Sequence, residues 1–123
     1  DVNIDLREYI TSMEEAYEWC DIIICRGGAL TISELMLFAV PSIIVPYPHA
    51  TDDHQMKNSI YLERKDAAIV INQKKFTQAY LAQVLKSLII NPEIRKSLSK
   101  NILKLNEKNI TKNICNQIIK EMD

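Results

Sequence analysis

The segment Cys25–Glu34, with the sequence CRGGALTISE, combines two adjacent glycines with hydroxyl and carboxylate side chains. An apolar run ends at Cys25, the glycines turn the chain, and a helical pattern follows. Glycine permits a positive φ and the close approach of a ligand. A helix that begins at such a turn offers free amide groups and the positive end of its dipole, which suit a phosphate. Thr31 and Ser33 add hydroxyl donors, and Glu34 could accept hydrogen bonds from a ribose diol. The spacing alone is equally consistent with a tight turn that binds nothing.

A second polar segment, PYPHATDDHQMKN, follows the next apolar run and opens the next helical pattern. His49, Asp52, Asp53 and His54 could be read as metal ligands, but we favour helix capping by Asp52 with Asp53 beside the helix dipole. We therefore expect no metal site here. His54 and Gln55, in the first turn, could hydrogen-bond sugar hydroxyls. His49 could act as a general base, although no nearby carboxylate is evident to orient it.

Lysines recur every four residues in the last third of the chain, at Lys96, Lys100, Lys104, Lys108 and Lys112. On a helix this spacing produces a slowly drifting basic stripe. We interpret the stripe as a solvated face opposite an apolar face formed by Leu98, Ile102 and Leu105. The alternative is contact with an anionic membrane surface.

Composition limits the class of protein further. The chain has 123 residues, of which 47% are hydrophobic and 25% charged, so a packed domain or part of one is expected. No apolar run approaches the ~18 residues that a membrane span needs. Residues 1–60 carry ten acidic and three basic side chains, a sum of −7, whereas residues 84–123 carry four acidic and eight basic ones, a sum of +4. The acidic front half argues against a nucleic-acid partner.

The cysteines of the chain are three in number and irregularly spaced: Cys20, Cys25 and Cys115. Neither a disulfide framework nor a zinc site has this pattern. We expect reduced thiols in a cytosolic protein.

Apolar patterning and helix caps predict strands that alternate with helices. The expected strands are Val2–Leu6, Asp21–Cys25, Ser42–Val45 and Ala67–Ile71. The expected helices run from the Ser12 cap, with Glu15 completing a capping box, to about Trp19, and over Leu30–Phe38, Asp53–Arg64, Thr77–Ile90, Pro92–Glu107 and Thr111–Glu121. Alternation of this kind predicts an α/β fold, a Rossmann-like parallel sheet with helices on both faces. We expect residues 1–123 to form part of one domain, with the sheet in about 1–75 and helices in about 76–123.

The same residues resemble the MurG family of bacterial N-acetylglucosaminyltransferases, which convert lipid I to lipid II in peptidoglycan synthesis. The stretches that carry the resemblance are Tyr9-Ile10, Met13, Tyr17–Asp21, Cys25–Glu34, Val40-Pro41, Val45-Pro46, His49, His54-Gln55 and Asn58. The resemblance implies a GT-B fold, of which this chain would be the later part of the C-terminal domain. That domain binds UDP-N-acetylglucosamine.

The resemblance also assigns a role to each donor-binding residue. It places Ile10 against the uracil through its backbone and Ala29, Leu30 and Thr31 around the diphosphate. Ile32 and Ser33 belong to the same donor-binding segment, Glu34 holds the ribose hydroxyls, and Gln55 with His54 reads the sugar hydroxyls. The family often has Ala or Ser where Gly28 stands. No cofactor, no metal and no catalytic residue is expected in this chain.

Two parts of the family pattern are missing from the sequence: the N-terminal domain with its acceptor site, and the early glycine-rich loop of the donor domain. We therefore expect a piece of a longer polypeptide that is inactive as a transferase alone. Its expected partners are UDP-N-acetylglucosamine, lipid I through the missing domain, and an anionic membrane by peripheral contact, with no nucleic acid. The expected location is the cytoplasm, peripheral on the inner face of the bacterial membrane. Two alternatives stay open: another GT-B enzyme, such as a UDP-sugar epimerase or lipid glucosyltransferase, and a noncatalytic or split nucleotide-sugar-binding subunit.

Overall fold

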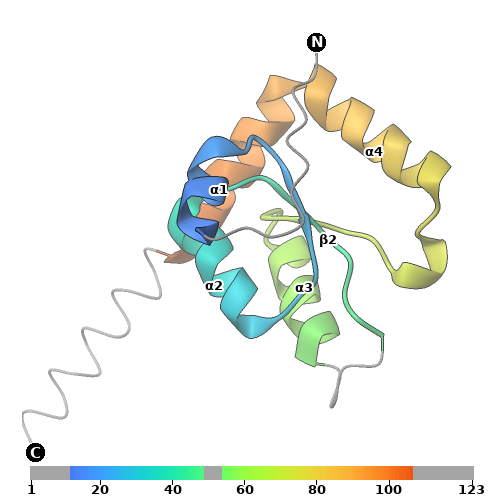
Figure 1. The fold of residues 1–123 in the computed structure, drawn as a ribbon, viewed down its shortest axis with the longest axis horizontal. Coiled ribbons are helices and arrows are strands. Elements are labelled where there is room, and N and C mark those ends of the chain that lie inside the picture. Colours follow the sequence, from blue (N-terminus) through green and yellow to red (C-terminus); the bar gives the residue numbers. More distant parts are fainter. Residues whose placement is uncertain (1–11, 49–53, 107–123) are drawn as a thin grey trace, which may run out of the picture.

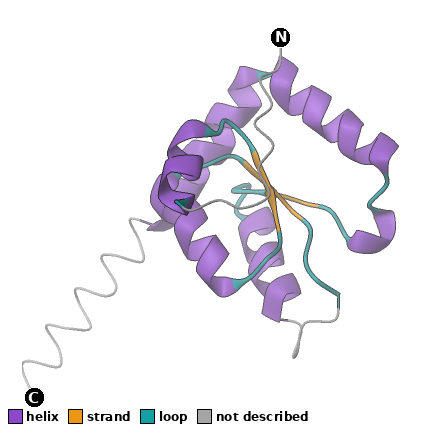
Figure 2. Ribbon diagram, in the orientation of Figure 1, coloured by secondary structure: helices purple, strands orange, loops and turns teal. Residues whose placement is uncertain are grey.

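A three-stranded parallel sheet lies at the centre of the structure, a computed structural model that describes residues 12–48 and 54–106 (Figure 2). The strands are β1 (Ile23–Cys25), β2 (Ser42–Ile44) and β3 (Ile69–Val70), in the order β1-β2-β3. Ile24 pairs with Ile43, and Ile44 with Val70. The expected strand at 2–6 and the expected helix at 111–121 lie outside the described residues.

Five helices surround this sheet within the described ranges. They are α1 (Met13–Trp19), α2 (Ala29–Phe38), α3 (His54–Arg64), α4 (Gln78–Ile90) and the helix over residues 92–106. A 3-10 turn, η2 (Gln73–Lys75), follows β3. The element order confirms the predicted alternation, whereas η2 was not predicted.

Two hydrophobic clusters form the core, one on each face of the sheet. The first joins α1, α2, α3 and the end of the 92–106 helix through Tyr17, Leu35, Leu62, Ile102 and Leu105, among others. The second joins the sheet to α4 and to the 92–106 helix through Ile43, Val45, Ile71, Leu88 and Leu98. Helix α4 accordingly lies on the opposite side of the strands from α2 and α3 (Figure 1). Helices thus cover both faces of the sheet, as a Rossmann-like fold requires.

Local capping explains where several helices begin and end. Ser12 Oγ accepts a hydrogen bond from the Glu15 N–H at 3.3 Å, and Thr77 Oγ1 accepts one from Tyr80 N–H at 3.1 Å. These are the side-chain caps that serine and threonine provide at a helix start. Helix α2 ends at Ala39, which takes a left-handed conformation with φ 52°, two residues before Pro41.

The strands are shorter than the sequence predicted, by one to three residues each. The parallel hydrogen bonds nevertheless continue past their ends, because Val45 N–H donates to the Cys25 carbonyl at 2.8 Å and Ile71 N–H to that of Ile44 at 2.9 Å. The difference therefore lies in where regular pairing is considered to stop, which varies by a residue or two at any strand end. All three residues of β2 are buried, as expected for a strand covered on both faces.

Candidate functional site

The two polar segments of the sequence meet at one edge of the sheet. Because the three strands are parallel, their carboxyl ends lie at the same edge, where open α/β sheets bind ligands. Three residues separate the end of β1 from the start of α2 at this edge, and α3 begins at His54, after the connection that follows β2. The structure therefore brings the start of Ala29–Glu34 close to the pair His54-Gln55.

Helix α2 begins without a side-chain cap. Its N-cap is Gly28, with φ −65° and ψ 148°, and no side chain accepts a hydrogen bond at this end. The first helical hydrogen bond runs from Ile32 N–H to the Gly28 carbonyl at 3.0 Å. The N–H groups of Ala29, Leu30 and Thr31 precede that bond and are not used by the helix. Leu30 is 75% exposed, so this helix start faces solvent. It presents amide donors and a positive dipole end together.

The two glycines of the turn have different physical roles, and neither takes a positive φ. The positive φ that glycine permits is therefore not used in this turn. A Cβ on Gly27 would collide with Ser59 Oγ and lie 2.8 Å from the Gln55 carbonyl oxygen. A Cβ on Gly28 would meet nothing nearer than Thr31 Oγ1 at 3.9 Å. Gly27 is required because α3 packs directly against it, whereas Gly28 lies in open space.

Gln55 connects the turn after β1 to the loop after β2. Its Oε1 accepts hydrogen bonds from Tyr47 N–H at 2.9 Å and from Gly27 N–H at 3.3 Å. One turn along α3, Ser59 Oγ donates to the Gln55 carbonyl at 2.6 Å. Two backbone N–H donors fix which end of the amide is oxygen. The amide NH₂ of Gln55 is consequently the part of this side chain that can address a ligand.

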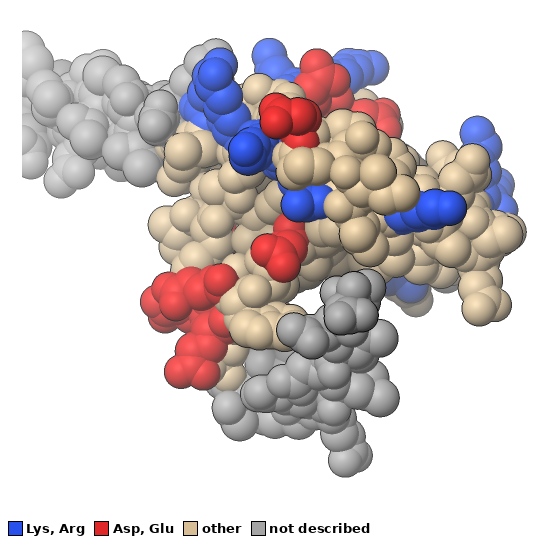
Figure 3. Space-filling view, turned by 90° about the horizontal axis from the view of Figure 1, so that it is seen from above, with Lys and Arg blue, Asp and Glu red and all other residues tan. Residues whose placement is uncertain are grey.

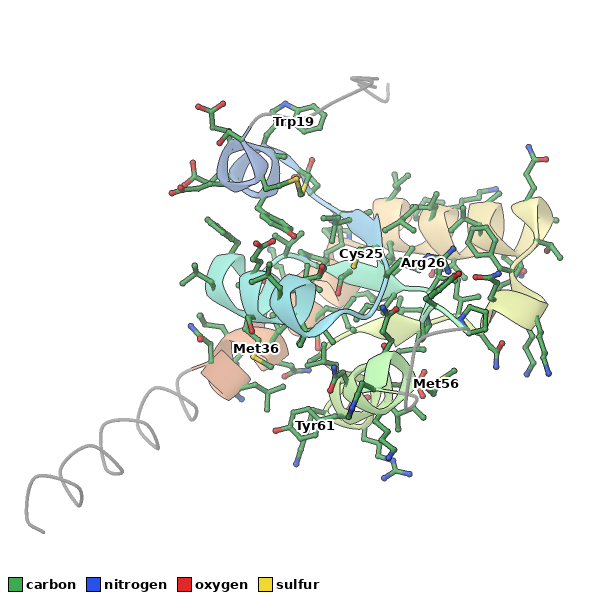
Figure 4. All side chains as sticks on the ribbon, turned by 60° about the horizontal axis from the view of Figure 1, so that its bottom comes forward. Trp19, Cys25, Arg26, Met36, Met56 and Tyr61 are labelled. Carbon is green, nitrogen blue, oxygen red and sulfur yellow. The ribbon has the colours of Figure 1, made fainter. Side chains whose placement is uncertain are left out.

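Arg26 links the loops that follow all three strands. Its guanidinium Nη1 donates to the Val45 carbonyl at 3.3 Å and to Gln73 Oε1 at 2.5 Å, and its Cζ lies 5.4 Å from the centre of the Tyr47 ring. Arg26, Val45 and Gln73 line an open cavity of about 460 Å³ together with Ile24, Cys25 and Phe76. Cys25 and Arg26 lie side by side where β1 ends, and Trp19 projects from α1 well apart from them (Figure 4).

Glu34 lies one turn into α2 beside Tyr17 of α1. Burial raises the pKa of the Tyr17 phenol above its usual value, and a hydrogen bond to Glu34 with the charge of that carboxylate adds to the rise. The Tyr17 ring stacks on Phe38 with centroids 5.3 Å apart. Tyr17 is 4% exposed, so packing fixes its ring beside Glu34.

The other predicted site residues have less freedom, or are not described. Ile32 is 7% exposed and packs in the core, so only its backbone could touch a ligand. The Ser33 hydroxyl donates to the Ala29 carbonyl at 3.1 Å, which engages the donor that the sequence offered to a phosphate. His54 is exposed at the start of α3. Ile10 lies outside the described residues, as do His49, Asp52 and Asp53, so their predicted roles stay predictions.

Sequence reasoning missed four residues of this edge: Tyr17, Arg26, Tyr47 and Gln73. Arg26 had a usable signal, because a charged residue that directly precedes a Gly-Gly turn must lie at the carboxyl end of its strand. Gln73 and Tyr47 similarly follow expected strands by two residues. Nothing in the spacing indicates that Tyr17 faces Glu34, since that contact depends on how α1 packs against α2.

The cysteines of the described part are both free thiols. Burial raises the pKa of the Cys25 thiol to about 11. Burial also raises the pKa of Cys20, partly offset by a backbone hydrogen bond, and its Sγ donates to the Tyr17 carbonyl at 3.6 Å. Raised pKa values keep both thiols protonated and poorly nucleophilic near neutral pH.

The lysine stripe forms a solvated helix face in the described residues. Lys96, Lys100 and Lys104 are exposed, whereas Leu98 and Ile102 on the same helix are buried. Seen from above, basic side chains alternate with acidic ones over the top of the molecule and do not form one continuous patch (Figure 3). Among the helices of the described ranges, none is long and apolar enough to cross a membrane.

Comparison with known sequences identifies the class of protein to which this fold and this edge of the sheet belong. The profile of the glycosyltransferase family 28 C-terminal domain matches residues 1–114, and the chain belongs to this family.

Within the family, the chain is similar to MurG-type enzymes. It is 39% identical over 121 residues to the UDP-N-acetylglucosamine--N-acetylmuramyl-(pentapeptide) pyrophosphoryl-undecaprenol N-acetylglucosamine transferase of Psychromonas ingrahamii, covering 96% of this chain and 34% of that protein. The enzyme of the same name from Tolumonas auensis is 43% identical over 89 residues, covering 72% of this chain and 25% of that protein.

The solved structure of Acinetobacter baumannii MurG superimposes with a TM-score of 0.69 and 35% sequence identity, covering 91% of this chain and 32% of that one. The similarity identifies the fold as the Rossmann-like C-terminal domain of a GT-B protein. The chain spans about a third of the length of the curated relatives that it matches most extensively.

Proposed function

We propose that this chain is the donor-binding part of a MurG-type transferase that uses UDP-N-acetylglucosamine and glycosylates lipid I. The observation that carries the proposal is the uncapped start of α2 at the carboxyl edge of the sheet, where three N–H groups precede the first helical bond. Such a helix start binds phosphate groups. The relatives, named as N-acetylglucosamine transferases, support a nucleotide diphosphate sugar as the phosphate-bearing ligand.

The helix start also suits the chemistry of the transfer. In an inverting displacement, an acceptor hydroxyl attacks the anomeric carbon, the bond from that carbon to the diphosphate oxygen breaks, and UDP leaves. Negative charge grows on the departing diphosphate. Preorganised N–H donors at Ala29, Leu30 and Thr31 would stabilise that charge without reorganising. Within the described residues we assign no general base, so deprotonation of the acceptor hydroxyl falls to another part of the full enzyme.

The remaining donor contacts follow from the positions of two side chains. Glu34, beside Tyr17, would accept hydrogen bonds from the ribose hydroxyls. The amide NH₂ of Gln55 would donate to a sugar hydroxyl, because its Oε1 is already held by two backbone N–H groups. We add Ile10 at the uracil and His54 at the sugar on the strength of the family resemblance.

The acceptor sets the proposed location of the enzyme. The relatives are named for an acceptor linked to pyrophosphoryl-undecaprenol, a lipid, so the transfer would take place at a membrane surface. We propose peripheral attachment to the inner face of the bacterial membrane. Basic side chains do not form one continuous patch on the face shown in Figure 3, so we assign the main membrane contact to another part of the full enzyme.

A titration of the ¹⁵N-labelled chain followed by NMR tests the proposed site. UDP-N-acetylglucosamine and UDP should both shift the amide signals of Ala29, Leu30 and Thr31, because the diphosphate is proposed to contact those groups. Free N-acetylglucosamine lacks the diphosphate and should leave the same signals unchanged. Shifts confined to the opposite edge of the sheet, or no shifts with UDP at millimolar concentration, would refute the proposal.

A further inference from the structure

We propose that Gln55 is a positioning residue for the diphosphate turn as well as a contact for the donor sugar. This inference rests on the proposed function, because it assigns a second role at the same site. A residue that only read the sugar would have no influence on the shape of the turn before α2. The hydrogen bonds of the Gln55 side chain give it that influence.

The first observation is the bridge that Gln55 Oε1 makes between two loops. One oxygen accepts from Tyr47 N–H, in the loop after β2, and from Gly27 N–H, in the turn after β1. The partners are 8 and 28 residues from Gln55 in the sequence. Gly27 directly precedes Gly28, the N-cap of α2. The bridge therefore acts two residues before the first of the amides proposed to bind the diphosphate.

The second observation is that the backbone of Gln55 is itself held against the turn. Ser59 Oγ donates to the Gln55 carbonyl, and a Cβ on Gly27 would collide with this pair of oxygens. The first turn of α3 is thus packed onto Gly27 with no room between them. Because the backbone of Gln55 is held so close to Gly27, few conformations of its side chain let Oε1 accept from both N–H groups. The position of Oε1 relative to the turn is therefore fixed.

The third observation is that the other end of the bridge is also restrained. The Tyr47 ring lies under the Arg26 guanidinium, which holds the Val45 carbonyl and Gln73. The loop after β2 is therefore tied to β1 and to the 3-10 turn after β3. Gln55 Oε1 joins this network to Gly27, so the position of the turn depends on the network as a whole.

The consequence is a coupling between the sugar and the diphosphate. The oxygen of the Gln55 amide shapes the diphosphate turn, while the NH₂ of the same amide is left to address the sugar. Removing the oxygen should weaken the binding of UDP, although UDP lacks the N-acetylglucosamine that Gln55 is proposed to contact. Binding of UDP therefore separates the positioning role from sugar contact.

The test begins with Gln55→Met, which keeps the length of the side chain and removes its acceptor. Amide hydrogen exchange of the ligand-free chain should speed up at Gly27 and Tyr47, by roughly fivefold or more for the loss of one net hydrogen bond at each. Affinity for UDP should fall by a similar factor, about fivefold. Lys57→Met is the matched control, since Lys57 is exposed on the same helix and should leave both quantities unchanged.

Gln55→Glu separates the two halves of the amide and remains informative should Gln55→Met fold poorly. Its carboxylate keeps the acceptor oxygens but cannot donate to the sugar, so Gly27 and Tyr47 should stay protected from exchange. The ratio of UDP-N-acetylglucosamine affinity to UDP affinity should fall, by about fivefold. The ratio is the proper readout because the new charge repels both diphosphates alike.

Three results would overturn these claims in distinguishable ways. Unchanged exchange at both amides in Gln55→Met would refute the bridge. Faster exchange with undiminished UDP affinity would refute the positioning role while leaving the proposed function intact. Failure of the unsubstituted chain to bind UDP at all would refute the proposed function, and with it the proposed effect of the bridge on diphosphate binding.

Discussion

Glu34 is the residue whose proposed role can be isolated most cleanly by substitution. A charge-assisted hydrogen bond to the ribose is worth roughly 1.5–3 kcal/mol, so Glu34→Ala should weaken UDP binding by about 10- to 100-fold in calorimetry. Glu63→Ala is the control, because Glu63 is an exposed carboxylate at the far end of α3. The affinity of the Glu63→Ala variant for UDP should change less than about twofold. Equal losses in the two variants would remove the ribose role from Glu34.

Cys25 gives the fold a pH dependence with a definite sign. Its thiol has a pKa raised by burial from an ordinary 9.0 to about 11, so the folded state disfavours the thiolate. The stabilisation from the protonated thiol is complete below pH 9 and is lost as the pH rises toward 11.

The free energy of unfolding, measured in urea under reducing conditions, should therefore fall in that interval more steeply for the native chain than for Cys25→Ala. Subtracting the variant removes the titration of lysines and tyrosines, which both chains share. A difference between the two chains that stays constant up to pH 11 would contradict the assignment.

Residue types and spacing indicated part of the candidate site, whose ligand contacts stay predictions, and could not indicate the rest. The segment at Ala29–Glu34 was identifiable because a Gly-Gly turn between an apolar run and a helical pattern has a local physical meaning. The contact of Tyr17 with Glu34, and that of Arg26 with Gln73 across 47 residues, depend on helix packing and on side-chain conformations. The back-bond from Ser33 to Ala29 is likewise a choice of conformation that competes with a ligand.

At the scale of the elements, the turn before α2 is fixed by packing and not by backbone conformation. Gly27→Ala would force a methyl group into Ser59 and the Gln55 carbonyl, and overpacking of this kind costs about 1–3 kcal/mol. Gly28→Ala should cost less than about 1 kcal/mol, because its Cβ enters open space and the chain loses flexibility when unfolded. Urea denaturation of the two variants gives the comparison directly. If Gly28→Ala proved the more destabilising, the packing of α3 on Gly27 would be wrong.

The elements themselves were largely predictable, for reasons that differ between helices and strands. Ser12 caps a helix as the sequence indicated, because capping depends only on neighbours three residues away, and Thr77, expected as the first residue of its helix, proves to be its cap. The strands were predicted one to three residues too long, since an apolar run does not show where its partner strand stops pairing. The 3-10 turn after β3 was missed, and it places Gln73 beside Arg26.

At the scale of the whole molecule, we propose a donor site in this chain and assign no general base among its described residues. The purified 123-residue chain should therefore yield no lipid II from UDP-N-acetylglucosamine and lipid I. A chimera that joins it to the preceding two-thirds of the Psychromonas ingrahamii transferase, 39% identical in the matching region, should show turnover. The same chimera with Glu34→Ala is the control for donor binding. Turnover by the chain alone would refute the inference that another part of the full enzyme supplies the base.

The central claim is that the start of α2 binds a diphosphate by its own amides and dipole. Calorimetric titration of the chain with UDP and with uridine, first with a chelator and then with magnesium or manganese added, tests it most directly. UDP should bind in chelator, at least about tenfold more tightly than uridine, a difference of ~1.4 kcal/mol, and added metal should change its affinity little. Equal affinity for UDP and uridine, or UDP binding that appears only after metal is added, would contradict the account.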